Sequence, residues 1–216
     1  MTQTEQALQL LPAAVAEAGE ALWETYFPAD LPQDWQLAFY AHSHRRLLLP
    51  ARLWPGTAGA AFGPWGEAVP ATLRLSLEWP GQVSPEEGAA VCRALAAEIG
   101  ECLEAVLVPA ADPATVDAIA AALRAAGLER LRIGGPAQAR PLAHAREARF
   151  HPFAAGPDGH GAWVIDPEPG LDPAAWRELV EALLAAGGHG PTPVFLRTQP
   201  ERLADLRTII RLLGAA

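Results

Sequence analysis

Residues 26–54 read YFPADLPQDWQLAFYAHSHRRLLLPARLW. The stretch opens with an aromatic turn. Pro32 and Asp34 then favour a helix start, because proline is tolerated in a first helical turn and a carboxylate there meets the positive end of the helix dipole. Residues 35–41 supply the apolar side of that helix, and three leucines at 47–49 predict a buried strand. The stretch therefore predicts a helix followed by a strand, as in an α/β fold.

The same alternation continues along the chain. Helix starts are marked by Ser84-Pro85, Asp112-Pro113 and Asp172-Pro173, since Ser and Asp cap helices and proline suits the first helical position. A last helix is expected to begin at Pro200-Glu201. Alternating or short apolar runs predict eight strands, at residues 7–12, 47–49, 72–79, 102–109, 130–135, 148–153, 161–166 and 193–198.

Strands recur roughly every 25 to 30 residues with helices between them, which indicates a parallel sheet joined by crossover helices. Eight such units predict a (β/α)8 TIM-barrel-like fold, small and irregular for a chain of 216 residues. The alternative is an open doubly wound parallel sheet. No linker or shift in composition divides the chain, so residues 1–216 are expected to form a single α/β domain.

The composition limits the partners and the mechanisms. A net charge of −9 repels polyanions, so nucleic acid is not an expected partner. No apolar run is long enough to span a membrane. All 16 basic residues are arginine, which excludes Schiff-base and P-loop chemistry that depends on lysine. Two cysteines and an N-terminus without a cationic signal-peptide start predict a cytoplasmic protein.

Alternation along the predicted strands indicates where the polar side chains lie. In TLRLSLEW (72–79) the leucines share one face, and the charged residues share the other. Helices cover the outside of a barrel, so the polar strand faces should point into it. The candidate ligand-binding residues on these inward faces are Arg74, Glu78, Arg132, Arg149, His151 and Arg197. Glu104 is a further acid on the same side.

Two interpretations of these residues stay open. Buried charges must be paired, so arginines and glutamates could form a network that fills a narrow barrel. Alternatively, the acids are few against four arginines, which favours a small anionic ligand, a carboxylate or a phosphate, at the carboxyl ends of the strands. The second interpretation is the expected function: a cytoplasmic barrel protein that binds a small anion.

The chain contains few motifs that carry known chemistry. It has no GxGxxG fingerprint, HExxH, CxxC or Gly-x-Ser-x-Gly elbow, so we expect no cofactor, no metal and no nucleophilic hydrolase chemistry. His42 and His44 lie two residues apart and cannot share a helix face as metal ligands. His151, Asp166 and Glu168 lie at predicted strand exits, where they could serve as a general acid or base. No catalytic residue is assigned.

Tryptophan is frequent, with seven in the chain. Trp54, Trp65 and Trp79 follow or end predicted strands, and residues 55–70 between them form a loop rich in glycine and proline. These tryptophans either pack in the core or line a surface for a partner. The alternative function is therefore a non-catalytic protein-interaction module that uses the Trp-rich region 54–79.

The aromatic segment carries a resemblance to a known family. The residues that match are Tyr26-Phe27-Pro28, Leu31-Pro32, Asp34-Trp35 and Phe39-Tyr40-Ala41. In this pattern the segment resembles the YecE-like family, a domain of unknown function whose fold is TIM-barrel-like. Family members usually carry a Glu-x-Asn-x-Thr-Phe-Tyr run at the second strand, where this chain has LLPARLW (48–54). The resemblance implies a barrel and a shortened, divergent relative that lacks those polar residues.

Overall fold

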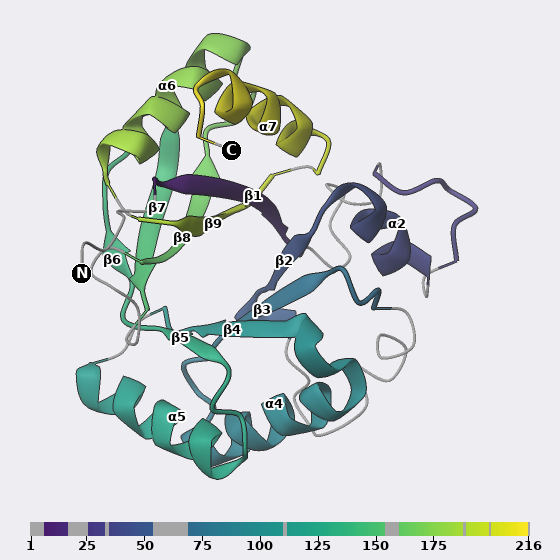
Figure 1. The fold of residues 1–216 in the computed structure, drawn as a ribbon, viewed down its shortest axis with the longest axis vertical. Coiled ribbons are helices and arrows are strands. Elements are labelled where there is room, and N and C mark those ends of the chain that lie inside the picture. Colours follow the sequence, from purple (N-terminus) through teal and green to yellow (C-terminus); the bar gives the residue numbers. More distant parts are fainter. Residues whose placement is uncertain are drawn as a thin grey trace, which may run out of the picture.

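The computed structural model describes residues 7–16, 26–32, 35–53, 69–109, 112–153, 160–187, 189–198 and 200–215. In these residues nine strands form one sheet (Figure 1). The strands are β1 (Gln9–Val15), β2 (Arg46–Leu49), β3 (Arg74–Glu78), β4 (Leu103–Leu107), β5 (Arg132–Gly134), β6 (Gln138–Ala139), β7 (Ala145–Pro152), β8 (Gly161–Pro167) and β9 (Pro191–Leu196). The α-helices are α2 (Gln36–Ser43), α4 (Pro85–Ile99), α5 (Pro113–Ala125), α6 (Pro173–Ala185) and α7 (Arg202–Leu212), and the short 3-10 helices are η2 (Ala51–Leu53) and η3 (Gly100–Cys102).

The sheet runs in the order β5-β4-β3-β2-β1-β9-β8-β7-β6. Neighbouring strands from β5 to β8 are parallel, whereas β7 is antiparallel to β8 and β6 is antiparallel to β7. The sheet curls until Gly134 of β5 forms one isolated antiparallel bridge with Phe153, which follows β7. The result is an open, mixed, curled sheet that resembles part of a barrel.

The predicted closed (β/α)8 barrel is therefore wrong, and the all-parallel doubly wound alternative does not fit either. Only residues 153–160 separate β7 from β8, and eight residues are too few for the crossover that a parallel pair needs. Residues 135–144, between β5 and β7, likewise contain no helix. They contain instead the short strand β6, which the sequence did not indicate.

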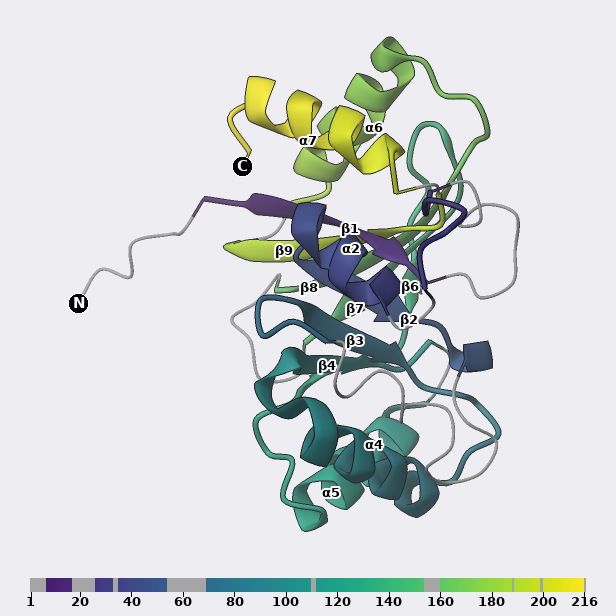
Figure 2. The ribbon, with the colours of Figure 1, turned by 90° about the vertical axis from the view of Figure 1, so that its right-hand side faces the viewer.

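The helices cover one face of the sheet. Their buried side chains join outward side chains of the strands, such as Leu75 and Leu77 of β3, in one large core, as the alternation in 72–79 predicts. Figures 1 and 2 show α6 and α7 beyond one part of the curled sheet and α4 and α5 beyond the other. Among the residues that the structure describes, strand residues and Phe153 fill the concave face. Its apolar cluster consists of Ala13, Val15, Leu48, Ala105, Leu107, Phe153, Ala162, Val164 and Phe195.

Several local predictions are confirmed, and one needs correction. Ser84 and Glu87 form a reciprocal capping box at the start of α4. The side chains of Asp112 and Asp172 cap α5 and α6. The first strand, expected at residues 7–12, continues through Pro12 to Val15, because burial between β2 and β9 outweighs the helix propensity of its alanines.

The hydroxyl of Tyr40 is inserted into the ladder between β1 and β2. The N–H of Ala16 donates directly to the carbonyl oxygen of Leu48 at 2.7 Å. Two residues earlier, the N–H of Ala14 donates to the Tyr40 hydroxyl at 3.1 Å, and that hydroxyl donates to the carbonyl oxygen of Arg46 at 2.6 Å. The side chain of α2 thus completes a backbone connection at the point where the two strands diverge.

A second contact joins α2 to the C-terminal helix. Arg207 of α7 donates to the carbonyl oxygen of Ser43 at 2.6 Å and lies 3.1 Å from Nδ1 of His44. The His44 ring stacks on Tyr40, with 4.6 Å between ring centroids. Burial, and then the charge of Arg207, lower the pKa of His44 to about 4, so the imidazole is neutral at pH 7 and Nδ1 accepts a hydrogen bond from Arg207.

Replacing Tyr40 by phenylalanine tests the inserted hydroxyl. Tyr40→Phe leaves the N–H of Ala14 buried without its partner, and we expect the free energy of unfolding to fall by about 1–3 kcal/mol. Urea denaturation measures the change. Tyr26→Phe is the comparison, because Tyr26 is only partly buried and water can replace its partners. An equal loss in both variants would contradict the role assigned to Tyr40.

Candidate functional site

A polar cavity lies where the parallel strands end. Its volume is about 100 Å³. Glu78 is the last residue of β3, Arg197 directly follows β9, and Asp166 lies near the end of β8. Strand β7 runs in the opposite direction, so its residues Glu147 and Arg149 lie opposite Asp166 and Val164 of β8 and reach the same cavity.

The charges around this cavity occur as pairs. Arg149 donates from Nε to Glu147 at 2.7 Å. Arg197 lies 3.6 Å from Glu78, which is a longer contact, and Glu78 also accepts a hydrogen bond from the N–H of Ala51 at 3.1 Å. Arg52 interacts with both of these residues. Burial first, and then the charge of Arg197, lower the pKa of Arg52, whereas the charge of Glu78 raises it. Each arginine near the cavity therefore lies close to a carboxylate.

Asp166 is paired from the outer side of the cavity. Arg146 donates to its carboxylate at 2.6 Å, and the Arg146 side chain is 58% exposed whereas that of Asp166 is 24% exposed. The pair places a carboxylate at the cavity wall with its cation towards solvent. Glu168, the other acid expected at this strand exit, faces His144 at 3.6 Å and does not line the cavity.

His151 is the buried member of the cavity, with 1% of its surface exposed. Its Nδ1 lies 3.3 Å from the carbonyl oxygen of Gly135, which can only accept, so the bond requires the proton on Nδ1. Burial lowers the pKa of His151 below its ordinary value and outweighs the opposing effects of Gly135, Glu78 and the backbone of Val108. The ring is therefore neutral at pH 7.

The structure divides the six candidate residues between two ends of the concave face. Glu78, Arg149, His151 and Arg197 meet at the carboxyl-end cavity. Arg132 is the first residue of β5 and lies at the amino ends of the strands. Arg74 opens β3 and donates to the carbonyl oxygens of Ala71 and Leu73, so it joins neither the cavity nor Arg132.

At the amino end, Glu104 bridges two arginines. Arg132 donates to Glu104 at 2.6 Å, and Nε of Arg46 lies 3.3 Å from the other oxygen of the same carboxylate. The guanidinium of Arg132 also lies over the ring of Phe153, 4.6 Å from its centroid. This arrangement is a paired network of the kind that the first interpretation describes, here at the amino end of the sheet.

Three residues of the cavity region were missed. Glu147 precedes the predicted strand 148–153, which begins at Ala145 in the structure. The alternation of Glu147, Arg149 and His151 along one face could have shown that the strand starts earlier. Arg52 lies on η2 and Arg146 points out of the sheet, and no periodic signal in the sequence marks either one.

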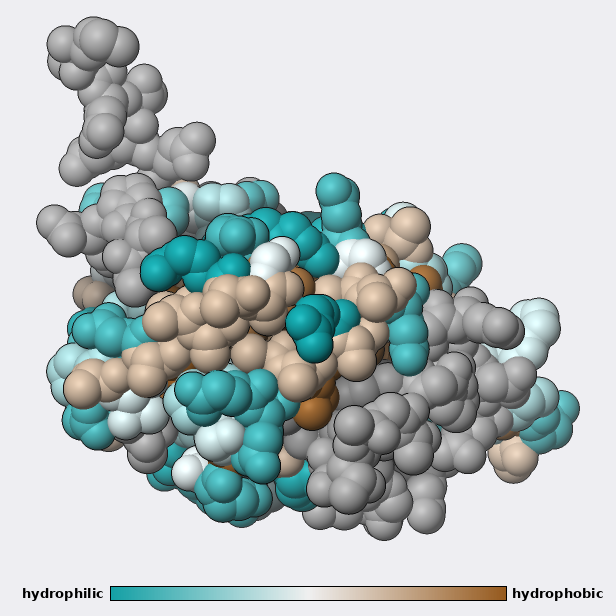
Figure 3. Space-filling model, turned by 90° about the horizontal axis from the view of Figure 1, so that it is seen from below, coloured by the Kyte–Doolittle hydropathy of each residue, from teal (hydrophilic) through white to brown (hydrophobic). Residues whose placement is uncertain are grey.

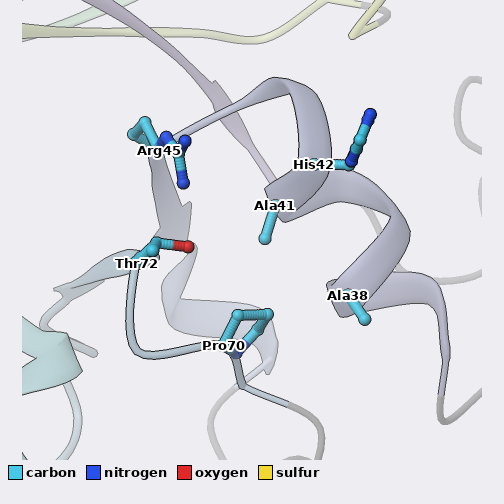
Figure 4. A pocket seen from close by; sticks show the side chains of 6 residues that line it. All are labelled: Ala38, Ala41, His42, Arg45, Pro70 and Thr72. Carbon is cyan, nitrogen blue, oxygen red and sulfur yellow. The ribbon is translucent and has the colours of Figure 1, made fainter.

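A second cavity lies beside α2, at the amino ends of β2 and β3. It has a volume of about 340 Å³ and is lined by Ala38, Ala41, His42, Arg45, Pro70 and Thr72 (Figure 4). In Figure 4 the His42 side chain points away from Pro70 and Thr72, and Arg45 and Thr72 lie on the opposite wall. Since few of its polar groups converge, we regard the smaller carboxyl-end cavity as the better candidate site.

The described residues of the Trp-rich region do not present an aromatic surface. Trp79 is 3% exposed, its ring occupies the space beside Gly88 of α4, and its Nε1 lies 3.4 Å from the carbonyl oxygen of Val83. Trp54 and Trp65 lie outside the described residues. In the described part of the chain, no group of three His, Cys, Asp or Glu residues is arranged to hold a metal ion, and no helix is long and apolar enough to cross a membrane.

Stability below neutral pH tests the environment of His151. Because its pKa in the fold lies below the ordinary value of 6.5, the unfolded chain binds more protons as the pH falls through 6.5. Stability should therefore decrease from pH 7 to pH 5, and His44 adds to the same decrease. Urea titrations should show a smaller decrease for His151→Gln than for wild type, while His42→Gln at an exposed position leaves it unchanged. Equal decreases in wild type and His151→Gln would contradict a buried neutral imidazole.

Comparisons with known proteins show a likeness to a solved structure. No family model and no curated protein matches the chain. The crystal structure of a DUF72 family protein from Thermotoga maritima is similar, with a TM-score of 0.51 and 11% sequence identity over 95% of this chain and 99% of that one. At this identity the likeness shows the fold alone, so this chain shares an α/β architecture with a DUF72 protein along nearly its whole length.

Proposed function

We propose that the protein binds a small organic acid in the carboxyl-end cavity. The observation that carries the proposal is the convergence of Arg149 and Arg197, from two different strands, on one cavity whose floor is the buried His151. Their side chains are 38% and 28% exposed, so both guanidinium groups are held by the fold and can still be reached by a ligand. Guanidinium groups bind carboxylates through paired N–H donors.

The charge balance of the cavity narrows the class of ligand. Glu78, Glu147 and Asp166 line it together with the two arginines, so the lining has no uncompensated positive charge. A simple anion would meet three carboxylates. An acid that also carries a hydroxyl or ammonium group would offer its carboxylate to an arginine and its donor to Glu78 or Asp166. We therefore infer a hydroxy acid or amino acid as the preferred ligand.

The size of the cavity sets an upper limit on the ligand. A volume of about 100 Å³ equals the space of roughly three water molecules in the liquid. A short-chain acid fits this space, whereas a nucleotide or a sugar phosphate does not. The longer contact between Arg197 and Glu78 marks the place where a ligand can separate a cation from its partner at the lowest cost.

We also infer kinship with the YecE-like proteins. Two independent observations support it: the aromatic pattern of residues 26–41, and the likeness of the whole fold to a DUF72 structure. Within the segment, the hydroxyl of Tyr40 connects β1 and β2, so this residue of the aromatic pattern contributes to the fold of this chain. The kinship concerns descent and architecture, and the ligand is argued from the cavity alone.

Calorimetric titration tests the ligand class. Glycolate and glycine should bind more tightly than acetate, because only they offer a donor to the carboxylates. Arg197→Gln should weaken binding of glycolate and glycine by about tenfold or more through loss of the charged hydrogen bonds. Glu78→Gln should reduce the preference for glycine over acetate while retaining an oxygen that accepts from Ala51.

The matched control is Arg177→Gln, which removes an exposed arginine on α6 that pairs with Glu181. It should leave every affinity unchanged. Absence of binding by all three acids, or equal binding by wild type and Arg197→Gln, would refute the proposal. A thermal melt of each variant shows whether a lost affinity reflects the cavity or a lost fold.

A further inference from the structure

The outer face of α4 and α5 is an apolar groove. The groove has a volume of about 550 Å³, and all the residues that line it are alanines except Glu86 and Arg93. Its alanines include Ala89, Ala90, Ala118, Ala121, Ala122 and Ala125. In Figure 3 this side of the molecule shows a continuous apolar band bordered by polar residues. The band is on the side away from the sheet, because the sheet-facing side chains of these helices are Leu95, Ile99, Ile119 and Leu123.

The helix pair at the other part of the sheet provides an internal comparison. On α6, Arg177 and Glu181 form an exposed ion pair one turn apart, and on α7 Arg202 lies 3.5 Å from Asp205. These faces are typical of solvated helices, with opposite charges three or four residues apart. The α4–α5 face differs, since its exposed ridge is alanine and its charges have no ion-pair partner in the described residues.

Two charged residues line the groove, and both are on α4. Glu86 and Arg93 are seven residues apart. Seven residues are two helical turns, about 10.5 Å, so the acid and the base lie on the same side of the helix but too far apart to pair with each other. The spacing leaves both charges available to a partner.

Both helices point the same way across this face. Each connects neighbouring parallel strands, β3 to β4 and β4 to β5, so both run antiparallel to the sheet. The groove spans residues 86–93 of α4 and 118–126 of α5, which places Glu86 at one end of the face and Arg93 at the other. The face therefore has an acidic end and a basic end with an apolar centre.

We propose that this face binds a second copy of the same chain. A two-fold axis in the plane of the face and perpendicular to the helices places each α4 antiparallel on the other α4, and each α5 on the other α5. The acidic end of one face then meets the basic end of the other, so Glu86 approaches Arg93 of the second copy. Alanine ridges let the helix axes approach closely, and the interface is self-complementary, as two-fold symmetry requires.

Sedimentation equilibrium of the full chain tests this interface. Wild type should form a reversible dimer of twice the 22.8 kDa chain mass, with a dissociation constant in the micromolar range. Ala121→Arg places a long cationic side chain on the exposed ridge of α5 and should raise the dissociation constant at least about tenfold. Ala185→Arg makes the same change at an exposed position on α6 and should leave it unchanged.

Charge reversal distinguishes a second copy from any other occupant. In Glu86→Arg, the new arginine meets Arg93 of the second copy across the two-fold axis. In Arg93→Glu, the new glutamate meets Glu86 of the second copy. Each substitution should weaken the dimer. The double variant E86R/R93E restores opposite charges and should recover the affinity. A monomer at every concentration, or a dimer that neither Ala121→Arg nor Glu86→Arg weakens, would overturn the proposal. Circular dichroism of each variant confirms that its helices are intact.

Discussion

A curled sheet with helices on one side has to fill its other side with its own side chains. Here small apolar residues such as Ala13, Ala105 and Ala162 occupy the middle of the concave face, because converging strands leave little room there. Charged residues are confined to its two ends, where water reaches them. A charge in such a place requires a partner, and this requirement produces an Arg–Glu network at each end.

The two ends differ in how tightly their charges are paired. At the amino end, Glu104 is held by two arginines, and Phe153 lies under Arg132. At the carboxyl end, Glu78 and Arg197 lie further apart and border a cavity. The closely paired end contributes to stability, whereas the end with the cavity can exchange an internal contact for a ligand. The same chemistry thus serves structure at one end and, in our proposal, binding at the other.

Which side of each strand packs against the helices could be predicted from the sequence. The alternation of apolar and polar residues in stretches such as 72–79 depends only on which side the helices cover. Strand direction could not be predicted from the regular spacing alone. The short connection 153–160 was the available signal for an antiparallel β7. The regular spacing of the strands favoured a parallel arrangement instead. The split of the candidate site has the same physical origin. Arg132 and Arg197 share an inward face, but one opens its strand and the other follows its strand, so they lie at opposite ends.

In our proposal, the amino-end charges stabilise the fold and the carboxyl-end charges bind the ligand. The substitution Arg132→Gln tests this difference most directly. Urea denaturation and glycolate titration are measured on the same protein. The account predicts a free energy of unfolding lower by about 1–2 kcal/mol, because Glu104 keeps only Arg46, with an unchanged affinity for glycolate. Full stability combined with lost glycolate binding would show that the amino end holds the ligand, and would contradict the account.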